Sequence, residues 1–370
     1  MLTSADILGP GGRIAARLPH YEHRDQQLAM AAAVASALEQ GEHLVVEAGT
    51  GVGKSFGYLV PAILAATRPE EEGGNEIKRI VVSTHTIALQ EQLIHKDLPL
   101  LNAVLPREFS AVLVKGRRNY LSLRRLESAL KRAQQTFLQP EEFAELKTLQ
   151  AWAKQTSDGS QSDLQHKPLN SVWDEIASDS GNCLGRNCPT YKDCFYFKDR
   201  RRVQHAQILV VNHALFFSDL ALRRAGVSIL PEYDAVLLDE AHTIEAVAGD
   251  HLGLGITSGQ VTYVLHKLYN DRTNKGLLVH HKSAPGQQLV ADCLHRADEF
   301  FQDVGEYLVV HRLKNGRISE PPPIGNRLSQ ELVKLSKLVK KLALGLENES
   351  DQQDLMSQHD RLLLLASELD

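Results

Sequence analysis

Five short apolar runs rich in β-branched residues recur along the chain, and stretches with helical spacing separate several of them. The runs predict buried strands at His43–Glu47, Arg79–Ser83, Ser110–Val114, Gln207–Val211 and Asp234–Leu238. The intervening stretches predict helices at Arg24–Glu39, Lys54–Ala66 and Thr86–Asp97. Alternating strands and helices are typical of a parallel sheet covered by helices. The pattern therefore predicts an α/β domain.

This alternation stops twice. From Gly116 to about Gln204 the chain is basic, helical and rich in Gln and Ser, and after Asp234–Leu238 the apolar positions follow helical spacing, as in Leu328, Leu332, Leu335, Val339, Leu342 and in Asp360–Leu369. The turn Pro321–Pro323 breaks this last part into a helical hairpin. We therefore expect residues 1–115 and 205–245 to form the α/β domain, residues 116–204 an inserted domain, and residues 246–370 a second, helical insertion.

Composition narrows the function classes. The chain has 43% hydrophobic and 24% charged residues and a net charge of −5, which fits a globular protein and excludes a uniformly basic DNA-coating protein. No apolar run is long enough to span a membrane, and the four cysteines are too few for a disulfide framework. We expect a cytoplasmic protein without membrane contacts, in which Cys293 is a small buried side chain.

A phosphate-binding loop is predicted where the first apolar run ends and a helix begins. It matches the Walker-type pattern with Ala as its first residue, and its candidate ATP-binding residues are Ala48, Gly49, Thr50, Gly51, Val52, Gly53, Lys54 and Ser55. Its glycines let successive backbone N–H groups face a triphosphate. We expect Lys54 to reach the β- and γ-phosphates and Ser55 to bind Mg²⁺. The alternative is a glycine-rich turn that matches by chance, which the flanking strand and helix disfavour.

A second motif, Asp239-Glu240-Ala241-His242, follows the last predicted strand. A carboxylate there holds Mg²⁺ from the side opposite Ser55, so Asp239 is the expected second metal ligand. Glu240 is suited to deprotonate the attacking water, and His242 to link the nucleotide site to a nucleic-acid site. By itself an acidic pair at a strand end is usually the solvated start of a helix. The candidate catalytic residues are Lys54, Asp239, Glu240 and His242.

Together these motifs resemble the DinG/XPD group of superfamily 2 DNA helicases, which are iron–sulfur enzymes that move 5′ to 3′ on single strands. The resemblance runs from about residue 20 to 245 and implies a RecA-like fold. Arg24 and Gln27 match the group's adenine-side Q-motif. Other matches imply DNA contacts at Thr84, Thr86, Gln90, Lys115, Arg117, Arg118, Asn119, Tyr120, Asn212 and His213. Without the family order, Gln27 would be a surface helix residue, and Thr84, Thr86 and Asn212 would be capping residues.

The clustered cysteines, Cys183, Cys188 and Cys194, indicate a metal site. The DinG/XPD group has the last three ligands of a 4Fe–4S cluster here, and its first ligand position is Ser122 in this chain. Serine departs from the pattern, because thiolate is the normal cluster ligand and an alkoxide binds iron less readily. A serine-ligated cluster, a three-iron cluster, a zinc site completed by His205, and three thiols without metal all stay open.

Basic and aromatic side chains crowd around these cysteines. Arginines next to aromatic rings suit a channel for a single strand, because charge follows the phosphates while rings stack on bases. A solvated helix face is the alternative reading of such a charge run. The residues concerned are Lys115, Arg117, Arg118, Arg124, Arg125, Lys131, Arg132, Lys198, Arg200, Arg201 and Arg202, with Tyr120, Phe195, Tyr196 and Phe197.

We therefore predict an ATP- and Mg²⁺-dependent DNA helicase of the DinG type, acting on single-stranded DNA or a forked duplex in repair or replication. The resemblance implies a second RecA domain with arginine fingers, and no strand–helix pattern follows residue 245, so we expect slow ATP hydrolysis by this chain alone. A P-loop kinase or GTPase-like switch is disfavoured because its acceptor or base-reading motif is missing. The alternative is a nucleic-acid-binding module that binds ATP without productive hydrolysis.

Overall fold

The structure is a computed structural model that describes residues 2–18, 20–72, 76–137, 139–224, 226–253, 255–313 and 315–369. The chain divides into two compact units, which we describe separately. The first unit comprises residues 1–116 and 198–253, and the second comprises residues 117–197 and 254–370. Across the described ranges, no helix combines the length and apolar character that a membrane crossing needs.

Four strands, nine α-helices and one π-helical turn account for most of the regular structure described in the first unit, which α11 enters from the second. In chain order they are α1 (Ser4–Leu8), α2 (Arg13–Arg17), α3 (Asp25–Gln40), α4 (Lys54–Ala66), β1 (Ile80–Thr84), α5 (Ile87–Gln92), a π-helical turn (Leu93–Asp97), α6 (Leu98–Val104), β2 (Ala111–Leu113), α11 (Phe195–His205), β3 (Ile208–Asn212), α12 (His213–Arg224), β4 (Ala235–Leu238) and α13 (Ile244–Leu252). These elements confirm the three predicted helices and four of the five predicted strands.

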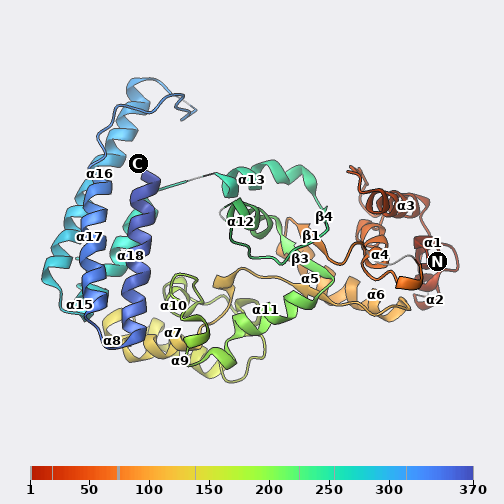
Figure 1. Cartoon of the computed structure of the whole chain (residues 1–370), viewed down its shortest axis with the longest axis horizontal. Coiled ribbons are helices and arrows are strands. Elements are labelled where there is room, and N and C mark those ends of the chain that lie inside the picture. The colour runs from red at the N-terminus through yellow and green to blue at the C-terminus, as the bar shows by residue number, and fades with distance from the viewer. Residues whose placement is uncertain are drawn as a thin grey trace. The chain divides into compact units, whose positions relative to one another are not determined.

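The strands form one parallel sheet in the order β2-β3-β1-β4. Figure 1 labels β1, β3 and β4, which are neighbours in this sheet. β1 lies inside the sheet, where Thr84 pairs with Asn212 of β3 and Ser83 pairs with Leu238 of β4. Because the strands are parallel, their carboxyl ends meet at the same edge of the sheet. His85 follows β1, His213 follows β3 and Asp239 follows β4 at this edge.

Helices cover both faces of this sheet. Ile80 and Val82 of β1 belong to a core with residues of α3, α4 and α6, while Val81 belongs to a second core with residues of α12. All five residues of β1 are buried, as expected for a strand with two covered faces. The predicted α/β architecture with a parallel sheet is confirmed.

The predicted strand at His43–Glu47 is wrong. Residues 42–49 form neither helix nor strand, and the Val45 side chain is 95% exposed. β1 already pairs on both sides, so this segment could join the sheet only beside β2 or β4, and it pairs with neither. An apolar β-branched run becomes a strand only where a neighbouring strand offers free N–H and C=O groups.

The second unit is helical. Its helices are α7 (Leu123–Lys131), α8 (Ala133–Thr136), α9 (Pro140–Trp152), α10 (Asn170–Ile176), α14 (Ser258–Leu268), α15 (Leu277–His280), α16 (Ala284–Val310), α17 (Leu328–Leu344) and α18 (Glu349–Leu369), and short 3₁₀ turns at Gly185–Asn187 and Tyr191–Asp193 lie between its cysteines. The five helices from α14 through α18 share one hydrophobic core, and α7, α9 and α10 share another.

The helical spacing predicted for the last part of the chain is confirmed. Leu328, Leu332, Leu335 and Val339 lie on one face of α17 and are fully buried. α17 and α18 pack side by side as a hairpin (Figure 1). Cys293 of α16 is buried in the same core, as predicted, and burial raises the pKa of its thiol to about 12.

Candidate functional site

The phosphate-binding loop ends where α4 begins. Gly51 and Gly53 have backbone φ angles of 85° and 81°, in the left-handed region that favours glycine. Gln27 of α3 is buried and donates its amide N–H to the Gly53 carbonyl oxygen at 2.9 Å, while the Tyr21 hydroxyl donates to the Gln27 amide oxygen at 2.9 Å. A Cβ on Gly53 would lie 2.1 Å from the Gln27 amide nitrogen. The loop conformation therefore depends on glycine at position 53.

Lys54 and Glu240 are 186 residues apart in sequence and form an ion pair. The Lys54 Nζ lies 2.8 Å from Glu240 Oε1, and both side chains are about one-third exposed, at 34% and 37%. Hydrogen bonding to Glu240 raises the pKa of Lys54, and the same contact lowers the pKa of Glu240. The fold thus joins the phosphate-loop lysine to the second motif.

Asp239 continues β4 and is hydrogen-bonded on two sides. Its backbone N–H donates to the Ser83 carbonyl at 2.9 Å, and its Oδ2 accepts the Tyr58 hydroxyl at 3.0 Å. Burial, the Asp239 charge and this hydrogen bond raise the pKa of Tyr58 well above its ordinary value, and a hydrogen bond with Ser55 opposes the shift. Tyr58 therefore connects Ser55 and Asp239, the two predicted Mg²⁺ ligands.

Glu240 adopts an unusual backbone conformation, with φ at 54°, where non-glycine residues are uncommon. Its N–H donates to Asp239 Oδ1 at 2.9 Å, and its carbonyl accepts the Thr243 hydroxyl at 2.9 Å. These contacts hold the carboxylate toward Lys54. His242 is largely exposed, and its Nδ1 lies 3.6 Å from Glu240 Oε2.

His213, the first residue of α12, bridges β1 and the second motif. Its Nδ1 lies 2.7 Å from the Ser83 hydroxyl, and its Nε2 lies 2.9 Å from the Asp239 carbonyl oxygen. The side chain is 1% exposed, and burial lowers the pKa of its imidazole. The His85 ring lies 6.1 Å from the His213 ring, so this histidine pair adjoins the candidate nucleotide site at the sheet edge.

The three clustered cysteines and Ser122 line one small pocket in the second unit. The Gly185 N–H donates to Cys183 Sγ at 3.3 Å, the Thr190 hydroxyl lies 3.3 Å from Cys188 Sγ, and backbone N–H groups of Tyr196 and Phe197 face Cys194. Ser122 accepts the Arg125 N–H at 3.4 Å and so caps α7. Within the described ranges, no three His, Cys, Asp or Glu side chains converge on one point as a single metal ion needs.

Comparisons with known proteins match the same motifs. The DEAD/DEAH box helicase family model matches residues 24–176, and the DEAD_2 model matches residues 165–261. The chain is 37% identical over 258 residues to "ATP-dependent DNA helicase YoaA" of Escherichia coli strain K12, covering 69% of this chain and 38% of that protein. It is 36% identical over 299 residues to "ATP-dependent helicase DinG" of Mycobacterium tuberculosis strain H37Rv, covering 73% and 43%.

The chain belongs to the DEAD/DEAH-box helicase family and is similar to helicases of the DinG type. It spans about two-fifths of the length of these relatives. A solved structure titled "XPD_Helicase" covers 94% of this chain at 13% identity, with a TM-score of 0.45.

The helicase-family positions proposed for DNA contact in the first unit are mostly occupied by internal contacts. Thr84 and Gln90 are buried, and the Thr86 hydroxyl caps α5 by accepting the Leu89 N–H at 3.2 Å. Asn212 caps α12, since its Oδ1 accepts the Leu215 N–H at 2.8 Å. Thr86 and Asn212 therefore act as helix-capping residues in this structure.

In the second unit, Tyr120 does not suit the stacking role that its position suggests. Its ring is 1% exposed because it lies in the core with α7 and α10, and Phe195 is also buried. Arg117 stacks over the Tyr196 ring at 4.3 Å, and Arg118 pairs with Asp174 at 2.6 Å. The arginine–aromatic combination is present, but at Arg117 and Tyr196.

Several residues of the candidate nucleotide site were not predicted. Tyr58, Tyr21 and Asp97 all contact it, and burial raises the pKa of Asp97, which a hydrogen bond with Ser55 opposes. Tyr58 follows Lys54 by four residues, so helical spacing places both on one face of α4. That spacing was the available signal for Tyr58. Tyr21 and Asp97 have no such spacing to the motif residues, and their contacts are visible only in the folded chain.

Proposed function

We propose that this chain binds Mg·ATP and is the nucleotide-binding part of an ATP-dependent DNA helicase of the DinG type, which moves 5′ to 3′ on single strands. The observation that carries the proposal is the pairing of Lys54 with Glu240 beside Asp239 at the carboxyl edge of a parallel sheet. Ligands bind at this edge in open α/β sheets. The names of the matched relatives, a DNA helicase and a helicase, agree with this function.

Each site residue then has a role that its position supports. The loop from Ala48 to Gly53 cradles the phosphates, with Gln27 holding the Gly53 carbonyl and Arg24 beside the adenine. Ser55 and Asp239 bind Mg²⁺. Lys54 moves from Glu240 to the β- and γ-phosphates when nucleotide binds, because the phosphate oxygens of Mg·ATP together carry more negative charge than one carboxylate. Glu240 is thereby freed to orient the attacking water.

Single-stranded DNA is the proposed partner, contacted along the sheet edge and around the cysteine pocket. Arg117 with Tyr196 offers charge and a ring face, the combination that binds a strand without reading its sequence. His242, exposed beside Glu240, suits the proposed link between nucleotide and strand. A role in DNA repair or replication follows from the resemblance.

An iron–sulfur cluster fits the cysteine pocket in part. Three thiols share one pocket, and backbone N–H groups are directed at the sulfur atoms of Cys183 and Cys194. Burial raises the pKa of the Cys194 thiol, which these N–H groups oppose. The fourth position is the hydroxyl of Ser122, which caps α7. We propose that Cys183, Cys188 and Cys194 hold the group, with Ser122 as a weaker fourth ligand. Such a cluster would supply a structural crosslink between segments far apart in the chain.

The test is whether nucleotide and a single strand bind to one folded protein and affect each other. Anisotropy of a labelled DNA strand is measured with and without a Mg²⁺-bound, non-hydrolysable ATP analogue, and with RNA and duplex DNA as comparisons. We expect strand binding that weakens steeply with salt and changes when the analogue is present. If the affinity for the strand is the same with and without the analogue, the result would instead support a simple nucleic-acid-binding module.

A further inference from the structure

The segment that leads into Cys183 is bonded to two helices along most of its length. Residues 177–182 form neither helix nor strand, yet side chains of α7 and α18, together with Arg117, bond to nearly every one of them. The contacts are Arg125 to the Ala177 carbonyl, Arg117 to the Ser178 hydroxyl, Arg361 to the Asp179 carboxylate, Gln353 to the Gly181 carbonyl and Arg124 to Asn182.

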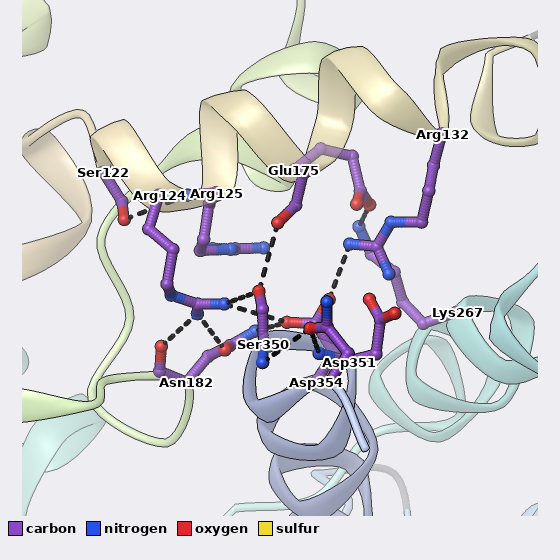
Figure 2. Close-up of polar contacts among 12 residues, drawn as sticks. Ser122, Arg124, Arg125, Arg132, Glu175, Asn182, Lys267, Ser350, Asp351 and Asp354 are labelled. Carbon is purple, nitrogen blue, oxygen red and sulfur yellow. Dashed lines mark hydrogen bonds and ion pairs between the residues drawn. The ribbon is translucent and has the colours of Figure 1, made fainter. Parts of the chain in front are cut away.

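The centre of this arrangement is the buried carboxylate of Asp354 (Figure 2). Arg132 Nη2 lies 2.6 Å from its Oδ2, and Arg124 Nη1 lies 3.8 Å from its Oδ1. The Asn182 amide donates to the same Oδ1 at 2.7 Å. Asp354 is 4% exposed, Arg124 is 5% and Asn182 is 9%, so these charges and hydrogen bonds lie almost out of water.

Arg124 joins the loop to this centre. Its Nη2 donates to both the Asn182 carbonyl at 2.7 Å and the Asn182 Oδ1 at 2.5 Å, and its Nη1 donates to the Ser350 hydroxyl at the start of α18. Figure 2 shows the side chains of Arg124, in α7, and of Arg132, just after α7, extending toward the first turns of α18. Asn182 immediately precedes Cys183, and Arg124 follows Ser122 by two residues.

Buried ion pairs of this kind add little net stability, because desolvation offsets the attraction between the charges. Their better-supported role is to fix one arrangement, since a misplaced partner leaves a charge buried and unpaired. Asn182 contributes a donor and two acceptors, so the chain just before Cys183 is held from both sides. None of these contacts involves a sulfur atom or requires a metal.

We propose that Arg124, Asp354 and Asn182 are positioning residues that hold Cys183 at its pocket without metal and connect the pocket to α18. The loop is thus already in place before any metal binds. All of these contacts join residues of the second unit. They therefore do not depend on nucleotide binding or on the identity of the metal.

The test is the alkylation rate of individual cysteines in chelator-treated, metal-free protein, read by mass spectrometry. Asn182→Ala removes the loop's side chain while the pairs of Asp354 with Arg124 and Arg132 stay. Losing a hydrogen bond to a charged group should raise local opening, and with it the rate at Cys183, by about tenfold. Cys293, buried in the helical core, should stay unreactive and so reports any global unfolding.

Two further variants complete the test. Asp360→Asn changes an exposed aspartate of the same helix and should leave the Cys183 rate unchanged. Asp354→Asn should raise it like Asn182→Ala, and if Asp354→Asn exposes Cys293 by unfolding, Asn182→Ala alone decides. The proposal is overturned if Cys183 in wild-type metal-free protein reacts as fast as in urea, or if Asn182→Ala leaves its rate unchanged.

Discussion

Gly53 shows how one residue sets the geometry of the nucleotide site. Its φ of 81° and the Gln27 amide together leave no room for a side chain. The backbone conformation and the close neighbour both require glycine at this one position of the phosphate loop. The Walker-type pattern predicts glycine there, but the partner that excludes a Cβ lies 26 residues earlier and is visible only in the fold.

Gly53→Ala should therefore lower the free energy of unfolding by about 1–2 kcal/mol, from left-handed strain alone, and more if Gln27 is displaced. Gly49→Ala is the matched control, because nothing lies within 4 Å of its Cβ position and its φ is not in the left-handed region. Urea unfolding of both variants measures the difference. Equal stabilities would show that the Gly53 conformation is not required.

His213 predicts a pH dependence of stability. Burial lowers the pKa of its imidazole in the folded chain, so the native state keeps it neutral while the unfolded chain protonates it at the ordinary value. The unfolded state therefore binds more protons below pH of about 6.5, and stability falls as pH falls, by at most about 1.4 kcal/mol per pH unit for this residue.

Unfolding in urea at pH 7.5 and 5.5 measures this effect. His213→Gln should flatten the dependence on pH relative to wild type, while His43→Gln, a change at an exposed histidine, should not. A His213→Gln protein that loses as much stability on acidification as wild type would contradict the assignment.

At the scale of elements, apolar periodicity predicted β1 to β4 and the helices α3, α4 and α17 because each of them buries an apolar face. It failed for His43–Glu47, whose composition is the same but which has no strand to pair with. Pairing partners depend on topology, which local periodicity does not encode. For the same reason the motifs predicted Lys54, Asp239 and Glu240 individually, whereas the Lys54–Glu240 contact required the fold.

The exposed run at residues 43–47 and the buried strand β1 each contain a valine, Val45 and Val81, whose effects on stability can be compared. Val45→Ala should change the free energy of unfolding by less than about 0.5 kcal/mol, since the side chain is 95% exposed. Val81→Ala in β1, at a fully buried position, should cost about 1–3 kcal/mol. Thermal or urea unfolding distinguishes them. A Val45→Ala loss as large as that of Val81→Ala would mean that residues 43–47 form a buried strand after all.

On the scale of the whole chain, each candidate site lies within one unit. The candidate nucleotide site belongs to the first unit and the cysteine pocket to the second. The structure places the three thiols and the Ser122 hydroxyl in the lining of one pocket, which spacing alone left open. Lys54 and the Mg²⁺ that Ser55 and Asp239 would hold supply positive charge from one side of a bound triphosphate, so we propose that the 370-residue chain hydrolyses ATP slowly by itself.

Ser122→Cys should raise the iron retained by protein purified without oxygen, because it replaces a weak fourth ligand with a thiolate. Ser122→Ala is the control, since both variants lose the α7 cap, at about 1 kcal/mol, and only cysteine adds a ligand. Iron per chain and visible absorption are measured for all three proteins. If every form is folded and free of iron, the cluster proposal fails.

The central claim is that the phosphate loop binds Mg·ATP through Lys54. Calorimetry with a Mg²⁺-bound, non-hydrolysable ATP analogue tests it on wild type, Lys54→Ala and Glu240→Gln. We predict that Lys54→Ala weakens binding about tenfold or more, as expected for lost charged hydrogen bonds. Glu240→Gln should bind as tightly or up to about fivefold more tightly, because Lys54 no longer leaves an ion pair. Equal affinity of wild type and Lys54→Ala would contradict the account.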